Sequence, residues 1–541
     1  MKSTYSYCYH SILGLLFCAF FSSQAIAATI TVNAQINQSG CDLIEAIQSA
    51  NQDFAVGGCV AGDEADEIII SGIHTLTMPF DNAGAPPPYG DAGLPTITTP
   101  IIISSSNSSS EIRREVNDPS NRFRIFNVIG SNASLTLNNI VVSGGDVEFD
   151  ISGNDNVTRG GGIYLFASEL SLNQSTITNN AAVSFGGGIY SSSSKIIISD
   201  SLITNNLANN ISAMSLNSDS EVVIANSTIE NNRTRRGSGN VVSALLTEKL
   251  KIINSSIVNN ASGGVKVQGG NLIMLDTTIS GNIKDTSMLN SILESISGLQ
   301  LSGFSGANSR HSIVNSTITD NPPAGTLAPD FIDIHGIRVI PPNTTSSDTL
   351  VVLVRNTIVS GNGASGSNGT PEGHEIHVYD DGANFIADDI FFEFNNNIIG
   401  HAGISQSLAL NNVTISSLDN QILTSDSVNP TELRDIINQL GNYGGPSPSH
   451  TLPADSPAID NGLFDGEPVL VLGEGVYWEP GCRGEDFAPG TNPPYRNDQR
   501  GLSRPIGTNC DVGSTEFRDS DIISNCYVVK AVNNNIVTFC L

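Results

Sequence analysis

A short alternation of apolar and polar positions recurs nine times between residues 135 and 399. Each copy has two apolar residues separated by one position and then, after four intervening residues, an Ile or Val, as in Leu170, Leu172 and Ile177. Alternation at i and i+2 predicts a strand with one buried face. The basal spacing between copies is about 22 to 28 residues, which is typical of a solenoid, and longer spacings indicate inserted loops. The copies start at Leu135, Leu170, Ile196, Val222, Leu250, Leu272, His311, Val351 and Phe392.

Polar residues at two fixed places in the repeat predict the corners of each coil. Asn and Asp tolerate left-handed backbone angles and stabilise turns. The first corner is expected two residues after the second apolar position, at Asn139, Gln174, Asp200, Asn226, Asn254, Asp276, Asn315, Arg355 and Asn396. The second corner is expected at a trailing Asn, and stacking of coils would bring these side chains into a ladder. The trailing residues are Asn180, Asn206, Asn232, Asn260, Asn282 and Asn321.

Glycine runs before several copies predict a third strand. Residues 160–164 and 186–190 both read Gly-Gly-Gly-Ile-Tyr, and each run stands at the same distance before the next copy. Strand residues follow the glycines, which argues against a phosphate-binding loop, since that loop needs a helix there. Three strands and three turns per coil predict an all-β fold, a right-handed parallel β-helix solenoid.

The glycine run, together with Thr-Ile-Thr-Asn-Asn at residues 176–180, resembles the repeats of polymorphic outer-membrane proteins. The resemblance covers roughly residues 130–400. It implies a β-helix of the pectate-lyase-like superfamily and a location at the cell surface.

The first 27 residues are typical of a secretory signal peptide. Lys2 precedes an apolar segment at residues 12–21, and Ala25-Ile26-Ala27 is a cleavage motif. We therefore expect a secreted protein that is extracellular or on the outer cell surface. No later segment has the roughly 18 consecutive apolar residues that a membrane-spanning helix needs.

A short helical cap is predicted before the repeats. Asp42 and Glu45 have the spacing of a capping box, and the helix should end near Asn51. Residues 41–47 with Ala50-Asn51 resemble the CSLREA domain of secreted bacterial proteins, although Ile44 replaces that family's Arg. The resemblance implies location and architecture and no particular chemistry.

A second module is predicted after the repeats. Residues 440–446, 456–462 and 498–501 resemble motifs of the choice-of-anchor Q domain, a family that precedes surface-anchoring tails. After it, two β-rich runs around Asn533-Asn534-Asn535 predict a hairpin, which we interpret as a sorting or docking tag. The expected organisation is signal peptide 1–27, CSLREA-like cap 28–80, β-helix 81–429, choice-of-anchor Q-like β-rich module 430–517 and stapled tail 518–541.

Six cysteines lie outside the signal peptide, and an even number in a secreted chain predicts disulfides. Many pairings are possible. Proximity in sequence favours Cys41 with Cys59, Cys482 with Cys510, and Cys526 with Cys540.

The composition limits the range of partners. The 541 residues carry a formal net charge of −29, whereas nucleic-acid binding needs a basic face. The one basic cluster is Arg233, Arg235 and Arg236, which could be a solvated loop or could bind an anionic sugar. Tyr477 and Trp478 could stack on sugar rings or form a local core. We expect a monomer.

The densest candidate for catalysis is the segment 374–381. Many β-helices cleave acidic polysaccharides with clustered carboxylates, histidines and a basic residue, sometimes with Ca²⁺. No catalytic residue is assigned, and the candidates are His335, Arg338, His374, Asp380 and Asp381. No cofactor is expected, although Ca²⁺ could bind Asp380, Asp381, Asp388 and Asp389.

An ordinary strand also explains this segment. Ile376 and Val378 would then point inward, while Glu375, His377 and Tyr379 would point outward. The preferred hypothesis is therefore a non-enzymatic scaffold, adhesin-like or binding polysaccharide or matrix. The alternative is a polysaccharide lyase or glycoside hydrolase acting on acidic polysaccharide.

Overall fold

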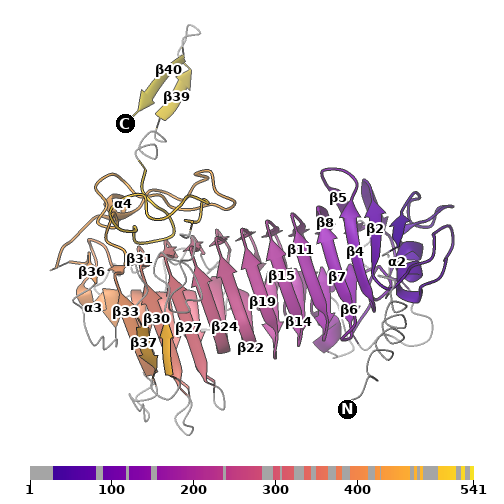
Figure 1. Ribbon diagram of the computed structural model, residues 1–541, viewed down its shortest axis with the longest axis horizontal. Coiled ribbons are helices and arrows are strands. Elements are labelled where there is room, and N and C mark those ends of the chain that lie inside the picture. Colours follow the sequence, from indigo (N-terminus) through magenta and orange to yellow (C-terminus); the bar gives the residue numbers. More distant parts are fainter. Residues whose placement is uncertain are drawn as a thin grey trace, which may run out of the picture.

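The chain winds into an elongated solenoid of parallel strands, a right-handed parallel β-helix (Figure 1). The fold class predicted from the repeats is confirmed. The expected signal peptide lies outside the described residues. The computed structural model describes residues 28–80, 89–116, 121–147, 155–235, 239–282, 296–304, 308–321, 334–342, 349–362, 373–379, 390–411, 421–426, 428–463, 468–471, 475–478, 497–518, 526–530 and 536–540.

One coil has three main strands, as the coil beginning at β10 shows. β10 (Ile163–Phe166), β11 (Glu169–Asn173) and β12 (Thr176–Thr178) follow one another around the coil. Each pairs in parallel with its equivalent in the next coil, so that Ile163 faces Ile189, Leu170 faces Ile196 and Ile177 faces Ile203. The third strand predicted from the glycine runs is confirmed.

The strands form four stacks along the solenoid. The first stack is β6 (Phe126–Ile129), β10, β14 (Ile189–Ser192), β18 (Met214–Asn217), β22 (Asn240–Ile253), β24 (Gly263–Leu275), β26 (Ile296–Ser302), β29 (Ile334–Ile340), β32 (His374–Val378) and β35 (Leu410–Asn411). The second stack is β1 (Thr29–Thr31), β2 (Asp66–Ile70), β4 (Pro100–Ser105), β7 (Ser134–Asn138), β11, β15 (Lys195–Ser199), β19 (Glu221–Ala225), β22, β24, β27 (Ser309–Val314), β30 (Leu350–Arg355) and β33 (Ile390–Asn395). The long strands β22 and β24 belong to both stacks.

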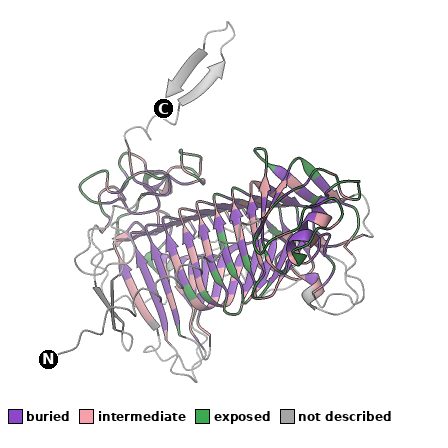
Figure 2. Cartoon of the chain, turned by 45° about the vertical axis from the view of Figure 1, so that its right-hand side comes forward, coloured by how far each residue is buried: buried purple, intermediate pink, exposed green. Residues whose placement is uncertain are grey.

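The third stack is β3 (Ile73–Leu76), β5 (Ser110–Arg114), β8 (Ile140–Ser143), β12, β16 (Leu202–Thr204), β20 (Thr228–Glu230), β23 (Ser256–Val258), β25 (Thr278–Ser280), β28 (Thr317–Thr319), β31 (Ile358–Ser360), β34 (Ile398–Ile399) and β36 (Ile422–Leu423). A short fourth stack is β9 (Asp146–Val147), β13 (Ala181–Ala182), β17 (Leu207–Ala208) and β21 (Arg233–Thr234). The inward aliphatic side chains of successive coils form one continuous core, seen as the buried stripes along the strands in Figure 2.

The predicted first corner is correct in eight copies and wrong in one. Positive φ angles occur at the predicted Asn, Asp and Gln residues, but in the eighth copy the residue is Asn356 (φ 47°) and not Arg355. There, Val352 and Val354 pair with the inward His311 and Ile313. Residues 350–354 are all apolar and all buried, so alternation could not distinguish the two faces of β30.

The predicted asparagine ladder is confirmed. Each amide Nδ2 donates to the Oδ1 atom of the next coil's Asn at 2.8–3.1 Å, and the ladder continues one coil further than predicted, to Asn362. Glu375 then accepts from Asn362 Nδ2 at 2.8 Å and is fully buried, so its predicted outward orientation is wrong. Glu375 occupies the position that Gly336 occupies in the preceding coil. A Cβ atom at Gly336 would lie 2.7 Å from Asn362 Nδ2, so this position faces the ladder. Glycine is therefore found there in the coil before Glu375.

The predicted helical cap is confirmed at the N-terminal end. Helix α2 (Leu43–Gln52) begins at a capping box, in which Asp42 accepts from Glu45 N and Glu45 accepts from Asp42 N. The predicted disulfide between Cys41 and Cys59 is present, with 4.5 Å between the Cα atoms. It ties the start of the helix to the segment that follows it.

Residues 428–463 and 497–518 form a C-terminal module that packs along the side of the last coils (Figure 1). Ile436, Leu452 and Val512 of this module form a core with the outward residues Ile358 and Ile398 of the β-helix. The remaining described elements are η1 (Asp155–Thr158), α3 (Gln406–Ala409), α4 (Leu433–Ile436), and the hairpins β37 (Pro468–Val471) with β38 (Gly475–Trp478) and β39 (Cys526–Lys530) with β40 (Ile536–Cys540).

The other two cysteine couples are described only in part. Cys510 is disulfide-bonded, and its predicted partner Cys482 lies outside the described residues. Cys526 and Cys540 are opposite one another in the β39–β40 pair, as predicted, but their side chains are outside the described part of the structure. Both pairings therefore stay predictions.

Candidate functional site

One row of outward side chains runs along the first stack, and we call it the outer row. Its members occupy equivalent positions in successive coils, one residue after an inward position such as Ile163 or Ile337. Parallel pairing in register places neighbouring members about 4.8 Å apart. The outer row is Asn127, Tyr164, Tyr190, Ser215, Ser243, Lys266, Gln300, Arg338, His377 and Asn411. Other segments bury Asn127, Tyr164, Tyr190, Ser215 and Gln300, whereas the other five members are half-buried.

The row is basic and polar towards the C-terminal coils. Arg338 pairs with Gln300 on one side and His377 on the other, and its Cζ atom lies 4.9 Å from the ring centroid of Tyr379. His377 Nδ1 is 3.0 Å from Asn411 Oδ1. Lys266, Arg338 and His377 are half-buried, and Tyr379 is exposed, so these side chains reach the surface.

Three histidines stack beside Arg338. The ring of His335 lies 4.4 Å from that of His377 and 5.4 Å from that of His374, and the ring planes are within 12° of parallel. His335 is buried, and neither of its ring nitrogens has a hydrogen-bond partner among the described residues. Burial, and then the neighbouring His377, His374 and Arg338, hold the pKa of His335 well below its ordinary value. The His335 ring is therefore neutral at physiological pH.

The row is aromatic towards the N-terminal coils. Tyr164 and Tyr190 stack at 5.2 Å between ring centroids, and Tyr89 adds a third ring 5.5 Å from Tyr164. The guanidinium groups of Arg124 and Arg159 lie over Tyr164 and Tyr190 at 4.8 and 5.1 Å. Burial raises the pKa of Tyr164 to about 12, so its hydroxyl stays protonated.

The structure brings together three of the five predicted catalytic candidates. His335 pairs with His374, and Arg338 is on the same strand as His335. Asp380, Asp381, Asp388 and Asp389 lie outside the described residues, so the Ca²⁺ site suggested there stays a prediction. In the described part of the chain, no group of three or more His, Cys, Asp or Glu side chains is placed to hold a metal ion.

The other sequence candidates are elsewhere. Arg233 belongs to β21 in the fourth stack and Arg235 follows it, while Arg236 is outside the described residues. Tyr477 and Trp478 are in β38, and their side chains are likewise outside the described part. Arg233, Tyr477 and Trp478 belong to strands outside the first stack and are therefore not members of the outer row.

Sequence reasoning missed the outer row as a unit. Lys266, Gln300, Arg338 and His377 are separated by long inserted loops, so their register could not be read from spacing. The Tyr164 and Tyr190 pair did carry a signal, because both follow the same Gly-Gly-Gly-Ile run.

A cleft of about 840 Å³ lies between the third stack and the C-terminal module. Thr319 and Asp320 form one wall, and Arg434, Tyr443 and His450 belong to the other. His450 is buried, with Nδ1 2.7 Å from Asn438 O and Nε2 2.9 Å from Ser280 Oγ. Both its nitrogens thus have structural hydrogen-bond partners, and the cleft carries less functional chemistry than the outer row.

Comparison with known proteins finds a likeness of fold. No protein-family model and no curated protein sequence matches the chain, so the resemblances to the CSLREA and choice-of-anchor Q domains stay predictions. A solved structure of the pectate lyase Pel9A aligns with 91% of this chain and 96% of its own, at 12% identity and a TM-score of 0.46. Within the described residues, no helix has the length and apolar character required to cross a membrane.

Proposed function

We propose that this protein is a secreted or surface-displayed, non-enzymatic β-helix scaffold that binds an extended acidic polysaccharide along the outer row. The observation that carries the proposal is the charge of that row. The chain has a net charge of −29, yet the outer row contains no Asp or Glu and includes Lys266 and Arg338. A cationic strip within an acidic surface selects anionic groups and repels them elsewhere.

The geometry of the row suits a polymer better than a small molecule. Its half-buried members Ser243, Lys266, Arg338, His377 and Asn411 follow one another along the long axis, so a linear chain can contact several coils. The half-buried guanidinium group of Arg338 can contribute a charge-assisted hydrogen bond to a carboxylate. At the aromatic end Tyr164 and Tyr190 are buried, so ring stacking on a longer chain would come from Phe166, which is 37% exposed and stacks on Tyr89.

The proposal is tested by affinity electrophoresis in gels containing polygalacturonate or alginate, with a neutral glucan gel for comparison. Acidic polysaccharides should retard the protein. Arg338→Gln and Lys266→Gln should each weaken binding about tenfold, because each removes one charge-assisted contact. Lys195→Gln is the matched control, since Lys195 is exposed on the second stack and lies outside the row. Unchanged mobility in acidic gels, or equal retardation of the Arg338→Gln and Lys266→Gln double variant, would contradict the proposal.

The second candidate is a polysaccharide lyase or hydrolase. One observation favours it: His335, Arg338 and His374 meet beside the row. Incubation with the same polysaccharides should then release reducing ends or unsaturated uronate products, and Arg338→Gln should abolish that release. If acidic polysaccharide retards the protein but no product forms, the scaffold proposal is supported. If product forms, the scaffold proposal is rejected in favour of the enzyme.

A further inference from the structure

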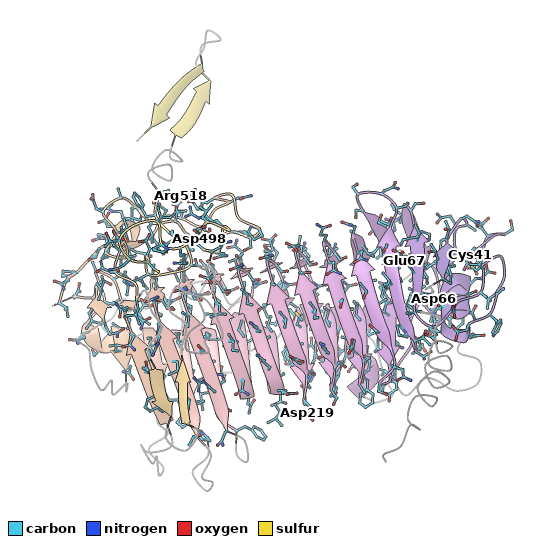
Figure 3. All side chains as sticks on the ribbon, in the orientation of Figure 1. Cys41, Asp66, Glu67, Asp219, Asp498 and Arg518 are labelled. Carbon is cyan, nitrogen blue, oxygen red and sulfur yellow. A yellow bond between two sulfur atoms is a disulfide. The ribbon has the colours of Figure 1, made fainter. Side chains whose placement is uncertain are left out.

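Four charged side chains of alternating sign form a line along the second stack, and we call this line the charged row. Parallel pairing places Lys195 between Glu169 and Glu221. It places Glu221 in turn between Lys195 and Lys249. The first three members are exposed, and Lys249 is half-buried. Asp219, in the corner that leads into β19, marks the position of the row in the middle coils (Figure 3).

The four charges of the row are not used inside the chain. Neighbouring members are about 4.8 Å apart along the stack, so each has an opposite charge within reach. Even so, none of the four makes an ion pair within the described part of the chain. The row therefore presents two carboxylates and two ammonium groups to a partner.

An apolar pair lies beside the centre of the charged row. Ile197 and Val223 stand two residues after Lys195 and Glu221, so they point outward from the same strands. Ile197 is 38% exposed, and Val223 is half-buried. Apolar surface in the middle with charges along the edge is the usual arrangement of a protein–protein interface.

We propose that this face of β11, β15, β19 and β22 binds a second copy of the chain, with the two solenoids antiparallel. Consider a two-fold axis that is parallel to the strands and lies midway between β15 and β19. It brings Lys195 against Glu221 of the second copy, and Glu169 against Lys249 of the second copy. Four alternating charges are thus self-complementary, and each contact occurs twice. The same axis brings Ile197 against Val223 of the second copy.

The local charge permits this contact, although the chain as a whole is acidic. A net charge of −29 makes two copies repel each other over most of their surface. The outward positions of these four strands carry two Glu and three Lys, and Glu248 in the adjacent bulge makes the numbers equal. Four coils extend only about 19 Å along the axis, so we expect a weak dimer. It replaces the monomer expected from the sequence.

The interface is separate from the outer row, which belongs to the first stack. Each copy in the dimer keeps its own outer row accessible. Lys195→Gln should therefore weaken the dimer and still bind acidic polysaccharide as the unaltered protein does.

Sedimentation velocity of the full chain tests the proposal. The unaltered protein should show a monomer–dimer equilibrium at concentrations up to about 100 µM. Glu221→Lys places like charges together at both central contacts and should weaken the dimer at least about tenfold. Glu230→Lys is the matched control, because it makes the same change in the same coil but on β20 of the third stack. Its dimer should persist.

Exchange of the two central charges distinguishes a dimer interface from a charge ladder that acts only within one chain. In Lys195→Glu combined with Glu221→Lys, each central charge again meets its opposite in the second copy, so the dimer should return. Within one chain, the exchanged row has like charges side by side at both ends, so a purely internal ladder would not be repaired. The proposal is overturned if the unaltered protein stays monomeric, if the exchanged variant dimerises no better than Glu221→Lys, or if Glu230→Lys weakens the dimer equally.

Discussion

At the scale of single residues, the asparagine ladder shows how a polar side chain becomes part of a core. Asn232 is buried, and its amide donates to Ile203 O, Glu230 O and Asn260 Oδ1 at 2.9–3.1 Å. Its Oδ1 accepts from both the backbone N and the Nδ2 of Asn206. One side chain thus satisfies backbone groups of its own and the preceding coil and joins the side chains of both neighbouring coils.

Replacement of Asn232 by Ala should therefore lower the free energy of unfolding by roughly 2–4 kcal/mol, because several buried partners lose their hydrogen bonds. Urea unfolding followed by circular dichroism measures the change. Asn231→Gly is the matched control: Asn231 is exposed at φ 54°, which glycine also adopts, so its midpoint should hardly move. Equal midpoints for both variants would contradict a stabilising ladder.

A second residue-scale prediction concerns pH. Burial lowers the pKa of His450 to about 4, although the hydrogen bond to Asn438 O opposes this shift. The folded pKa is below the unfolded value of about 6.5. Stability from the neutral ring is therefore complete above pH 6.5 and lost as the pH falls towards 4, by about 3 kcal/mol in total.

Hydrogen exchange of residues 438–452 at pH 7.5 and 4.5 checks this. Protection factors, which correct for the slower intrinsic exchange in acid, should fall at the lower pH in the unaltered protein and much less in His450→Gln, which does not titrate. His401→Gln is a useful comparison, because His401 is only half-buried and lies outside this segment. The same fall in protection in His450→Gln would assign the acid sensitivity to another group.

At the scale of strands and helices, the repeat predicts the coil wherever one face is polar. The spacing of Leu170, Leu172 and Ile177 gave the strands, and Asn and Asp gave the corners. Prediction failed where both faces are apolar, as in β30, whose outward Val351 and Leu353 are also buried. It failed again at Glu375, because sequence alone does not reveal that this position faces the end of a ladder.

The N-terminal cap supports a prediction at the same scale. The Cys41–Cys59 disulfide closes a loop with a sequence separation of 18, and it holds the start of α2 against the segment that follows the helix. In the Cys41→Ala and Cys59→Ala double variant, the cap should lose about 3 kcal/mol of stability, the value expected for a loop of this length.

Limited proteolysis with mass spectrometry checks this, with new cleavage expected between residues 41 and 66 before any in the coils. Addition of a reducing agent to the unaltered protein should reproduce the pattern. Simultaneous cleavage throughout the coils would show that the cap and the solenoid unfold as one unit.

At the scale of the whole molecule, the C-terminal module acts as a side wall for the last coils. Outward Ile358 and Ile398, which would otherwise be exposed, form a common core with the module. A buried ion pair between Arg504 and Asp276 joins the two parts, and Arg504 also donates to Glu516. The burial of these outward apolar residues could not be predicted from the repeat, because it depends on contacts with residues 436–512, which are distant in the sequence.

Gln499 makes the most concentrated polar contact between the module and the coils. Its Nε2 lies 2.7 Å from Ser256 Oγ and 3.1 Å from Ser255 O, and its Oε1 accepts from Thr278 Oγ1 at 2.6 Å. Gln499→Glu keeps the shape but replaces a buried donor with an acceptor facing carbonyl oxygens. This should cost at least about 2 kcal/mol at the interface.

Hydrogen exchange in β23, β25 and β28 should therefore accelerate in Gln499→Glu, while exchange in β11, β15 and β19 should stay unchanged, because Gln499 contacts the third stack at Ser256 and Thr278. Gln439→Glu is the matched control, since Gln439 is exposed on the module. Acidic-polysaccharide binding should survive in Gln499→Glu, because the outer row belongs to the first stack and the module packs on the third. Loss of polysaccharide binding together with faster exchange in β23, β25 and β28 would instead show that the module helps to form the binding face.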